Sequence, residues 1–178
     1  MFSSLATDEE TFLRGVAQTD SDGSVTFNTI FPGWYVSRAV HIHVRTYASE
    51  DGYKADNGTF VATGLGHHTG QVFFNDTLGE TLSTISPYSE NSLTWDDATK
   101  NADDSILVES EDGGWSGIVN IAYVDQADIT KGLIGTIEMG VNTTVESEEL
   151  SDSYWHGTTT TGTSLDTATA SVDATSTA

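Results

Sequence analysis

Short runs of apolar or alternating residues, punctuated by glycine, asparagine and aspartate, recur along the first 142 residues of this chain. Such runs predict strands, because successive side chains of a strand point to opposite faces and because turns favour these three residue types. The predicted strands cover residues 24–31, 40–45, 60–63, 71–74, 117–124 and 132–141. One short turn of helix is expected within residues 77–85. The pattern predicts an all-β fold, and in particular a β-sandwich.

The charge of the chain excludes several classes of partner. With 6 Lys+Arg against 27 Asp+Glu, the formal net charge is -21, so the chain repels phosphate backbones and anionic membrane surfaces. We therefore expect no nucleic-acid partner and no membrane insertion, since no apolar run is long enough to span a bilayer. The N-terminal residues also lack the charged start and apolar core of a signal peptide.

The chain contains no cysteine. This excludes disulfides, thiolate nucleophiles and zinc–thiolate sites. Any metal that the protein binds must therefore take oxygen and nitrogen ligands. The oligomeric state cannot be predicted from these features.

The composition changes near residue 143. Residues 158–178 are mostly Thr, Ser and Ala, and too few large apolar side chains remain to offset the entropy of ordering the chain. We expect three parts, which are a lead-in at 1–10, a folded domain at 11–142 and a disordered tail at 143–178.

Two features favour an extracellular or cell-surface location. The Thr and Ser content of the tail is typical of an O-glycosylated stalk, although an unmodified linker has the same composition. Three N-x-[ST] sequons, at Asn57, Asn75 and Asn142, also favour export.

The segment around residue 41 carries the most informative chemistry. His41 and His43 stand two apart in a predicted strand, so both imidazoles project from one face while the neighbouring valines and isoleucine pack on the other. Two adjacent imidazoles suit a first-row transition metal. The alternative is a solvated strand face that happens to carry two histidines, and the H-x-H pattern alone does not decide between them.

Tyr35 and Arg38 lie just upstream of this pair. A phenolate is a hard anionic ligand that favours ferric over ferrous iron, so Tyr35 points to Fe(III). Arg38 is placed to face a bound anion, or else it is an ordinary surface partner for one of the many carboxylates. The acidic pairs Asp96-Asp97 and Asp103-Asp104 lack the ligand spacing of a calcium loop, and we interpret them as solvated carboxylates.

Several motifs, taken in order, resemble the intradiol ring-cleavage dioxygenases and in particular their fungal extracellular branch. They lie at residues 11–15, 19–23, 27, 29–35, 38, 41–43, 68–74 and 132–135. The resemblance covers residues 11–142 and rests on several motifs with matching order and spacing. It implies the β-sandwich of that family and the cleavage of a catechol-type diol, with O2, to a muconate-type diacid.

The resemblance also implies a role for each matching residue. It assigns one non-haem Fe(III) to Tyr35, His41 and His43, with Tyr35 as the ligand that leaves the metal when substrate binds. It assigns to Arg38 the stabilisation of charge on the ring as oxygen attacks, and it places Gln71 in the wall of the substrate pocket. The implied partners are a small catechol and O2.

One family feature is missing. The first tyrosine ligand of the family lies upstream of the segment that begins at Phe12, and residues 1–34 contain no tyrosine. We therefore expect the chain to be the C-terminal part of such a catalytic domain, with a sandwich incomplete at its N-terminus. Two alternatives stay open: a secreted β-sandwich module that binds aromatic compounds without cleaving them, and an enzyme that uses the histidine pair for Fe(II) or Cu(II).

Overall fold

The computed structural model describes residues 13–63 and 66–145. These residues form two compact units, of which the first contains residues 13–29, 47–63 and 66–67 and the second contains residues 30–46 and 68–145. The predicted lead-in at 1–10 and residues 146–178 of the predicted tail lie outside the described residues. Among the described residues, no helix has the length and apolar character needed to cross a bilayer.

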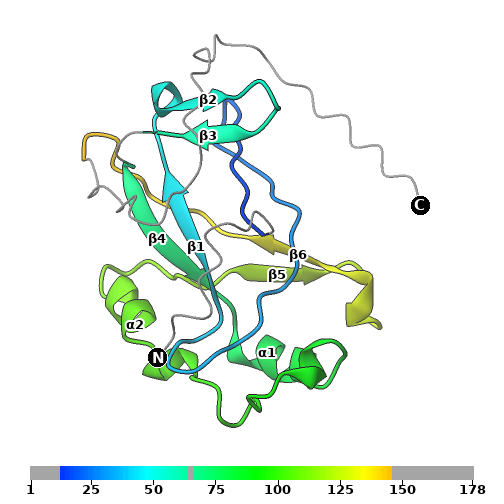
Figure 1. Ribbon diagram of the computed structural model, residues 1–178. Helices are drawn as coiled ribbons and strands as arrows, with labels where there is room; N and C mark the ends of the chain where they lie inside the picture. Colours follow the sequence, from blue (N-terminus) through cyan, green and yellow to red (C-terminus); the bar gives the residue numbers. More distant parts are fainter. Residues whose placement is uncertain (1–12, 64–65, 146–178) are drawn as a thin grey trace. The chain divides into compact units, whose positions relative to one another are not determined.

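In the described part of the chain, six strands form three antiparallel pairs (Figure 1). The strands are β1 (His41–Thr46), β2 (Gly52–Lys54), β3 (Phe60–Ala62), β4 (His68–Phe73), β5 (Asn120–Tyr123) and β6 (Leu133–Thr136). β1 pairs with β4, β2 with β3, and β5 with β6. The β2–β3 pair belongs to the first unit, and the other two pairs belong to the second.

The second unit also contains α1 (Asp76–Ser83) and α2 (Ser105–Glu111). Short 3-10 turns cover Ser49–Asp51, Tyr88–Glu90, Asn101–Asp103 and Ile129–Lys131. Each α-helix begins after a side-chain cap: the Asn75 side chain accepts a hydrogen bond from an amide of α1, and the Asp104 side chain accepts from two amides of α2. Such caps satisfy amide groups that the first helical turn leaves without partners.

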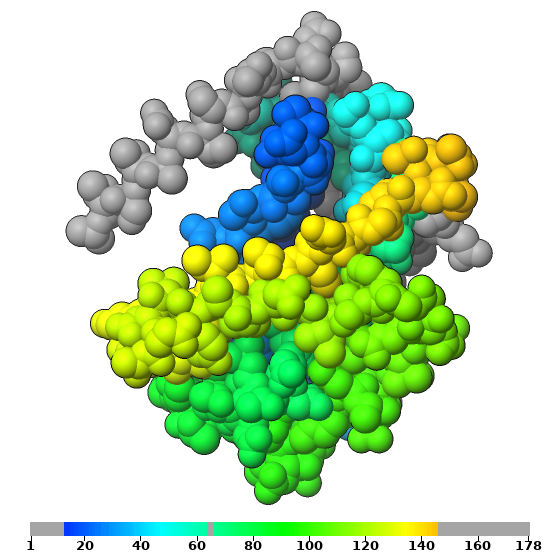
Figure 2. Space-filling model, turned by 180° about the vertical axis from the view of Figure 1, so that it is seen from behind, coloured from blue at the N-terminus to red at the C-terminus, as the bar shows by residue number. Residues whose placement is uncertain are grey.

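The main core of the second unit lies on one face of the β1–β4 pair. Val72 of β4 is buried there together with Leu78 and Leu82 of α1. Ile42 and Val44 of β1 pack against this cluster, so the apolar face of the predicted strand turns inward as expected. Figure 2 shows the green and yellow-green residues from α1 to β5 as one continuous surface of this unit.

A smaller buried cluster lies beneath the other face of the pair. It contains Ala39, Phe73 and Leu107, with Ile118 packed against them. Phe73 lies opposite His41 in the register of the pair, and directly opposed side chains share a face. This cluster therefore supports the face that carries the histidines.

The strand pattern is confirmed in most places and wrong in one. Five of the predicted runs contain a strand, and α1 confirms the helical turn expected within residues 77–85. The predicted strand at residues 24–31 is wrong, because that segment forms no strand in the described structure. Alternation supplies the pattern of a strand, but a strand also needs a neighbour that pairs its backbone groups.

Two elements, β2 and α2, are not predicted from the sequence. The run Ile106-Leu107-Val108 in α2 lacks helical spacing and contains two β-branched residues. The sandwich itself stays a prediction, since the described strands form two-stranded sheets without a closed barrel.

We expect Leu107→Ala to lower the free energy of unfolding by about 2–5 kcal/mol, because it leaves a cavity between Ala39, Phe73 and Ile118. The matched control is Ile106→Ala on the same helix, where the side chain is 41% exposed rather than 2%. The control should change stability by no more than about 0.5 kcal/mol. Urea unfolding measures both variants, and equal losses would contradict the packing described here.

Candidate metal centre

β1 presents two imidazoles on the face opposite the main core. His41 lies opposite Phe73 of β4, and His43 lies opposite Gln71. The Nε2 atoms of His41 and His43 are 3.2 Å apart. Two imidazole nitrogens bound side by side to one metal, each at about 2.1 Å, would lie about 3.0 Å apart. The pair is therefore spaced to share a single ion.

A backbone carbonyl sets the tautomer of His41. The His41 Nδ1 atom lies 2.7 Å from the carbonyl oxygen of Ala39, and because a carbonyl can only accept, Nδ1 carries the proton. In neutral His41 the Nε2 atom therefore keeps its lone pair, and in the metal-free protein the Nε2–H of His43 donates to it. Anchoring of the second ring nitrogen is typical of histidines that bind metals.

The surroundings lower the pKa of both imidazoles below the ordinary value of 6.5. Burial lowers the pKa of His41 most, and the charge of Arg38 lowers it further, while the Ala39 carbonyl and Asp104 act in the opposite direction. Burial also lowers the pKa of His43, followed by the charges of His41 and Arg38. Neutral imidazole is the form that binds metals, so this environment favours ligation.

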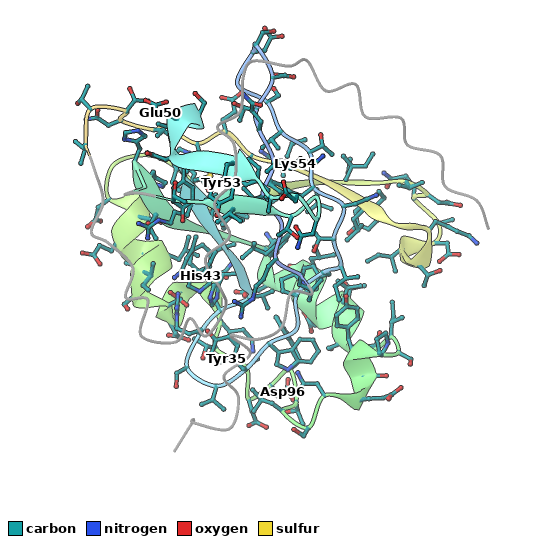
Figure 3. All side chains as sticks on the ribbon, turned by 45° about the horizontal axis from the view of Figure 1, so that its top comes forward. Tyr35, His43, Glu50, Tyr53, Lys54 and Asp96 are labelled. Carbon is teal, nitrogen blue, oxygen red and sulfur yellow. The ribbon has the colours of Figure 1, made fainter. Side chains whose placement is uncertain are left out.

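Tyr35 and Arg38 face each other across a tight turn. They form an isolated antiparallel bridge around Val36 and Ser37, and Ser37 adopts the left-handed φ of 76° that such a turn needs. Tyr35 is 53% exposed, and the centroid of its ring lies 6.0 Å from that of His41. Figure 3 shows Tyr35 on the loop that precedes β1, and His43 on β1 itself. The fold thus brings a phenol beside the imidazole pair.

The loop that leads into this turn is firmly held. Trp34 is buried, and its Nε1 atom donates to the carbonyl of Leu93 at 2.7 Å. The Asn91 side chain donates to the carbonyl of Trp34 at 2.9 Å. The backbone before Tyr35 is therefore fixed, although the Tyr35 side chain itself is exposed.

Tyr88 does not supply a second phenolate. Its hydroxyl donates to the carbonyl of Phe31 at 2.7 Å, and burial raises the pKa of Tyr88 above its usual value. Both effects favour the neutral phenol, which is a poor ligand for a ferric ion.

A buried carboxylate holds Arg38. The Arg38 Nε atom donates to Asp104 Oδ2 at 2.9 Å, and Nη2 donates to Asp104 Oδ1 at 3.4 Å. The same Nη2 donates to the Oε1 atom of Gln71. The guanidinium is thus tied to α2 through Asp104 and to β4 through Gln71, beside the histidine face.

Asp104 is ionised despite its burial. Burial alone would raise the pKa of Asp104, but the hydrogen bonds from Arg38, Ala39 and Leu107 and the charge of Arg38 lower it below its ordinary value. Asp104 is 1% exposed, so its interpretation as a solvated carboxylate is wrong. Arg38 does pair with a carboxylate, as the alternative expected, but that carboxylate is buried and does not lie at the surface.

The sequence carries only a weak signal for Asp104. The composition offers 27 acidic residues, and nothing in their spacing indicates which one meets Arg38. The one local signal is that Asp104 directly precedes Ser105 and an apolar run, which is the position of a helix N-cap.

A shallow cavity of about 380 Å³ lies elsewhere in the second unit. It is lined by Trp115, Ser116, Ile118, Asn120, Thr136, Ile137 and Glu138. None of the predicted site residues lines it, so it is not the pocket that the resemblance assigns to Gln71.

Comparison with known proteins finds similar chains among solved structures. No protein-family model and no curated protein matches the chain. Among solved structures it is similar to the intradiol ring-cleavage dioxygenase from Tetranychus urticae, with a TM-score of 0.51 and 28% identity over 72% of this chain and 53% of that chain. The chain is thus similar in structure and sequence to an intradiol ring-cleavage dioxygenase. A second dioxygenase crystal structure matches with a TM-score of 0.50 and 28% identity, over 72% of this chain and 52% of the other.

The resemblance to intradiol dioxygenases that the motifs predict is thereby confirmed, while the fungal extracellular branch stays a prediction. The chain spans about half the length of the solved structures that it matches. All five predicted site residues belong to the second unit, and the contacts described above join them into one group: Tyr35, Arg38, His41, His43 and Gln71. The role of each residue stays a prediction.

The donors at this intradiol-type site fit an iron ion. Two neutral imidazoles and a phenol form a nitrogen and oxygen set that suits iron. Within residues 13–63 and 66–145, no group of three or more histidine, aspartate or glutamate side chains gathers as a metal site. The phenol of Tyr35, whose ring centroid lies 6.0 Å from that of His41, stays the predicted third donor beside the histidine pair.

The two histidines should make the metal-free protein less stable in mild acid. Because their folded pKa values lie below 6.5, the unfolded chain takes up protons first as the pH falls below about 6.5. We expect the urea midpoint of the wild-type chain to fall between pH 7 and pH 5. A variant with both His41→Gln and His43→Gln should show a smaller fall, and parallel curves would contradict the lowered pKa values.

Proposed function

We propose that this chain carries the metal-binding part of a non-haem Fe(III) dioxygenase that cleaves catechol-type diols between their hydroxylated carbons. The observation that carries the proposal is the 3.2 Å separation of the two Nε2 atoms on β1, beside an arginine held by a buried carboxylate. His41, His43 and Tyr35 would hold the iron. When bound, Fe(III) supplies Lewis acidity toward the two catechol oxygens.

The proposed reaction needs no external reductant. The bond between the two hydroxylated carbons breaks, and each of these carbons gains one oxygen atom from O2. The diol loses four electrons, and O2 accepts them. The diacid therefore contains all the atoms of one catechol and one O2, and the reaction is balanced in atoms and charge.

Arg38 and Gln71 have the chemistry to act on the ring. The permanently charged guanidinium of Arg38 stabilises negative charge that develops on the ring, and its orientation is fixed before substrate binds. The Oε1 atom of Gln71 is used by Arg38, which leaves the amide N–H groups of Gln71 to donate to a substrate oxygen.

The exposure of Tyr35 supports its role as the ligand that departs. A phenol that is 53% exposed can move away without opening a cavity in the core. The backbone beneath it stays anchored through Trp34, so the side chain can leave and return to the same place.

We also propose that the protein is exported. Asn57, Asn75 and Asn142, which begin the three sequons, are all exposed, and an accessible asparagine is what glycosylation in a secretory pathway requires. Peptide mass spectrometry of the protein secreted from a eukaryotic host tests this, and unmodified asparagine at all three positions would contradict it.

The test of function is the product formed under labelled oxygen. We expect the iron-loaded chain to convert catechol to a diacid that contains two atoms from ¹⁸O2. Arg38→Ala should keep its iron but lose ring cleavage by about 100-fold or more, because it removes a preorganised positive charge. Lys131→Ala is the matched control, since it removes one positive charge from an exposed surface residue and should leave turnover unchanged.

Two outcomes would contradict the proposal. If Arg38→Ala cleaved the ring at the wild-type rate, Arg38 would have no role in ring cleavage. Binding of catechol without any product, in a chain that holds iron, would favour the module that binds aromatic compounds without cleaving them.

A further inference from the structure

A single buried carboxylate, Asp104, lies behind the candidate metal centre. It lies between the 3-10 turn Asn101–Asp103 and α2. Its oxygens accept hydrogen bonds from the Arg38 side chain, from the Ala39 amide and from the first amides of α2. It therefore joins the segment that leads into β1 to the start of α2.

The first of these contacts fixes the plane of the Arg38 guanidinium. Two nitrogens of Arg38 donate to the two oxygens of Asp104, and paired hydrogen bonds of this kind hold a guanidinium in one orientation. Within the described residues, the Nη1 atom of Arg38 makes no hydrogen bond. Its N–H groups are the ones left to meet a substrate or an anion.

The second contact reaches His41 through one residue. The Ala39 amide donates to Asp104 Oδ2 at 2.8 Å, and the Ala39 carbonyl accepts from His41 Nδ1 at 2.7 Å. Ala39 is itself fully buried. Since Ala39 is held through both its amide and its carbonyl, the direction of that carbonyl is fixed, and with it the ring and tautomer of His41.

We propose that Asp104 is the positioning residue of this site, which orients Arg38 directly and fixes the ring and tautomer of His41 through Ala39. Asp104 acts through these neighbours and contacts none of the proposed iron ligands directly. What Arg38 and His41 then do rests on the proposed function, whereas the positioning is a property of the protein alone.

The competing explanation is that Asp104 only caps α2. Asp104→Asn separates the two roles, because asparagine is as good a cap as aspartate and keeps one oxygen for the amides of Ile106 and Leu107. Its amide nitrogen cannot accept from Arg38 or Ala39. Asn75→Ala is the matched control, since it removes the cap of α1 without touching Arg38.

The direct test is NMR of the metal-free ¹⁵N-labelled chain. The chain contains three arginines, at positions 14, 38 and 45, and the Nε–H signal of Arg38 is assigned by its loss in Arg38→Lys. In Asp104→Asn we expect this proton to exchange with water at least tenfold faster. We also expect His41 to become a mixture of tautomers, while the backbone amides of β1 and β4 keep their protection and Asn75→Ala leaves both side chains unchanged.

Two results would overturn the proposal. One is an Arg38 Nε–H exchange rate in Asp104→Asn within twofold of the wild-type rate. The other is faster exchange of Arg38 that is matched by the amides of β1 and β4, because a purely structural role loosens all of them together.

Turnover supplies a second test that separates this proposal from the proposed function. If Asp104 acts through Arg38, adding Asp104→Asn to Arg38→Ala should lower kcat by less than the product of the two single effects. If the loss of kcat in the double variant equalled the product of the two single losses, the two residues would act independently, and the positioning role of Asp104 would be overturned. If the wild-type chain cleaves no ring, the proposed function fails while the NMR result still decides the positioning role.

Discussion

A carboxylate can be buried in its charged form only when hydrogen bonds and an opposite charge satisfy its oxygens, and in this chain that requirement shapes the candidate site. The guanidinium of Arg38, which lies 66 residues earlier in the chain, supplies the opposite charge for Asp104. The backbone amides of Ala39 and of the first turn of α2 supply further hydrogen bonds. Removing one partner of such a pair typically costs about 3–5 kcal/mol. The turn around Ser37, the start of β1 and the start of α2 are therefore held in one arrangement.

The outward face of β1 depends on this arrangement and gives the site its chemistry. A first-row metal ion with two imidazoles and one phenol keeps coordination positions free for other ligands, as catalytic sites require and closed structural sites do not. The phenol of Tyr35 is exposed, whereas the ring of His41 is anchored by the Ala39 carbonyl. This difference agrees with the different roles that the resemblance gives to Tyr35 and to the histidines. The shallow cavity near Trp115 belongs to another part of the second unit and contributes none of these groups.

The sequence predicts the strand that carries the histidines because two independent signals agree there. The alternation around residues 40–45 predicts the face on which each side chain lies, and the motif spacing indicates the resemblance to intradiol dioxygenases. The apolar residues Ile42 and Val44 turn inward as that alternation requires. Residues 24–31 show the limit of such patterns, since alternation without a pairing neighbour gives no strand.

Asp104 shows a second limit. The contact between Arg38 and Asp104 spans 66 residues, so no periodic pattern in the sequence indicates it. The local composition around Asp104 suggests a solvated acidic pair. Its burial follows from the placement of α2 against Phe73 and Ala39, and α2 is itself not predicted from the sequence, because its apolar residues are consecutive. The candidate donors can therefore be predicted from the sequence, whereas the carboxylate proposed to orient Arg38 and His41 cannot.

We expect one face of β1 to form an iron site, and metal analysis of the purified chain tests this. The purified chain would be loaded with Fe(III) and dialysed, its iron content measured, and its visible spectrum recorded before and after addition of catechol without oxygen. We expect about one iron per chain and a visible absorption band that shifts with catechol, and we expect His41→Ala to lose both. A colourless wild-type chain, or full iron content in His41→Ala, would contradict it.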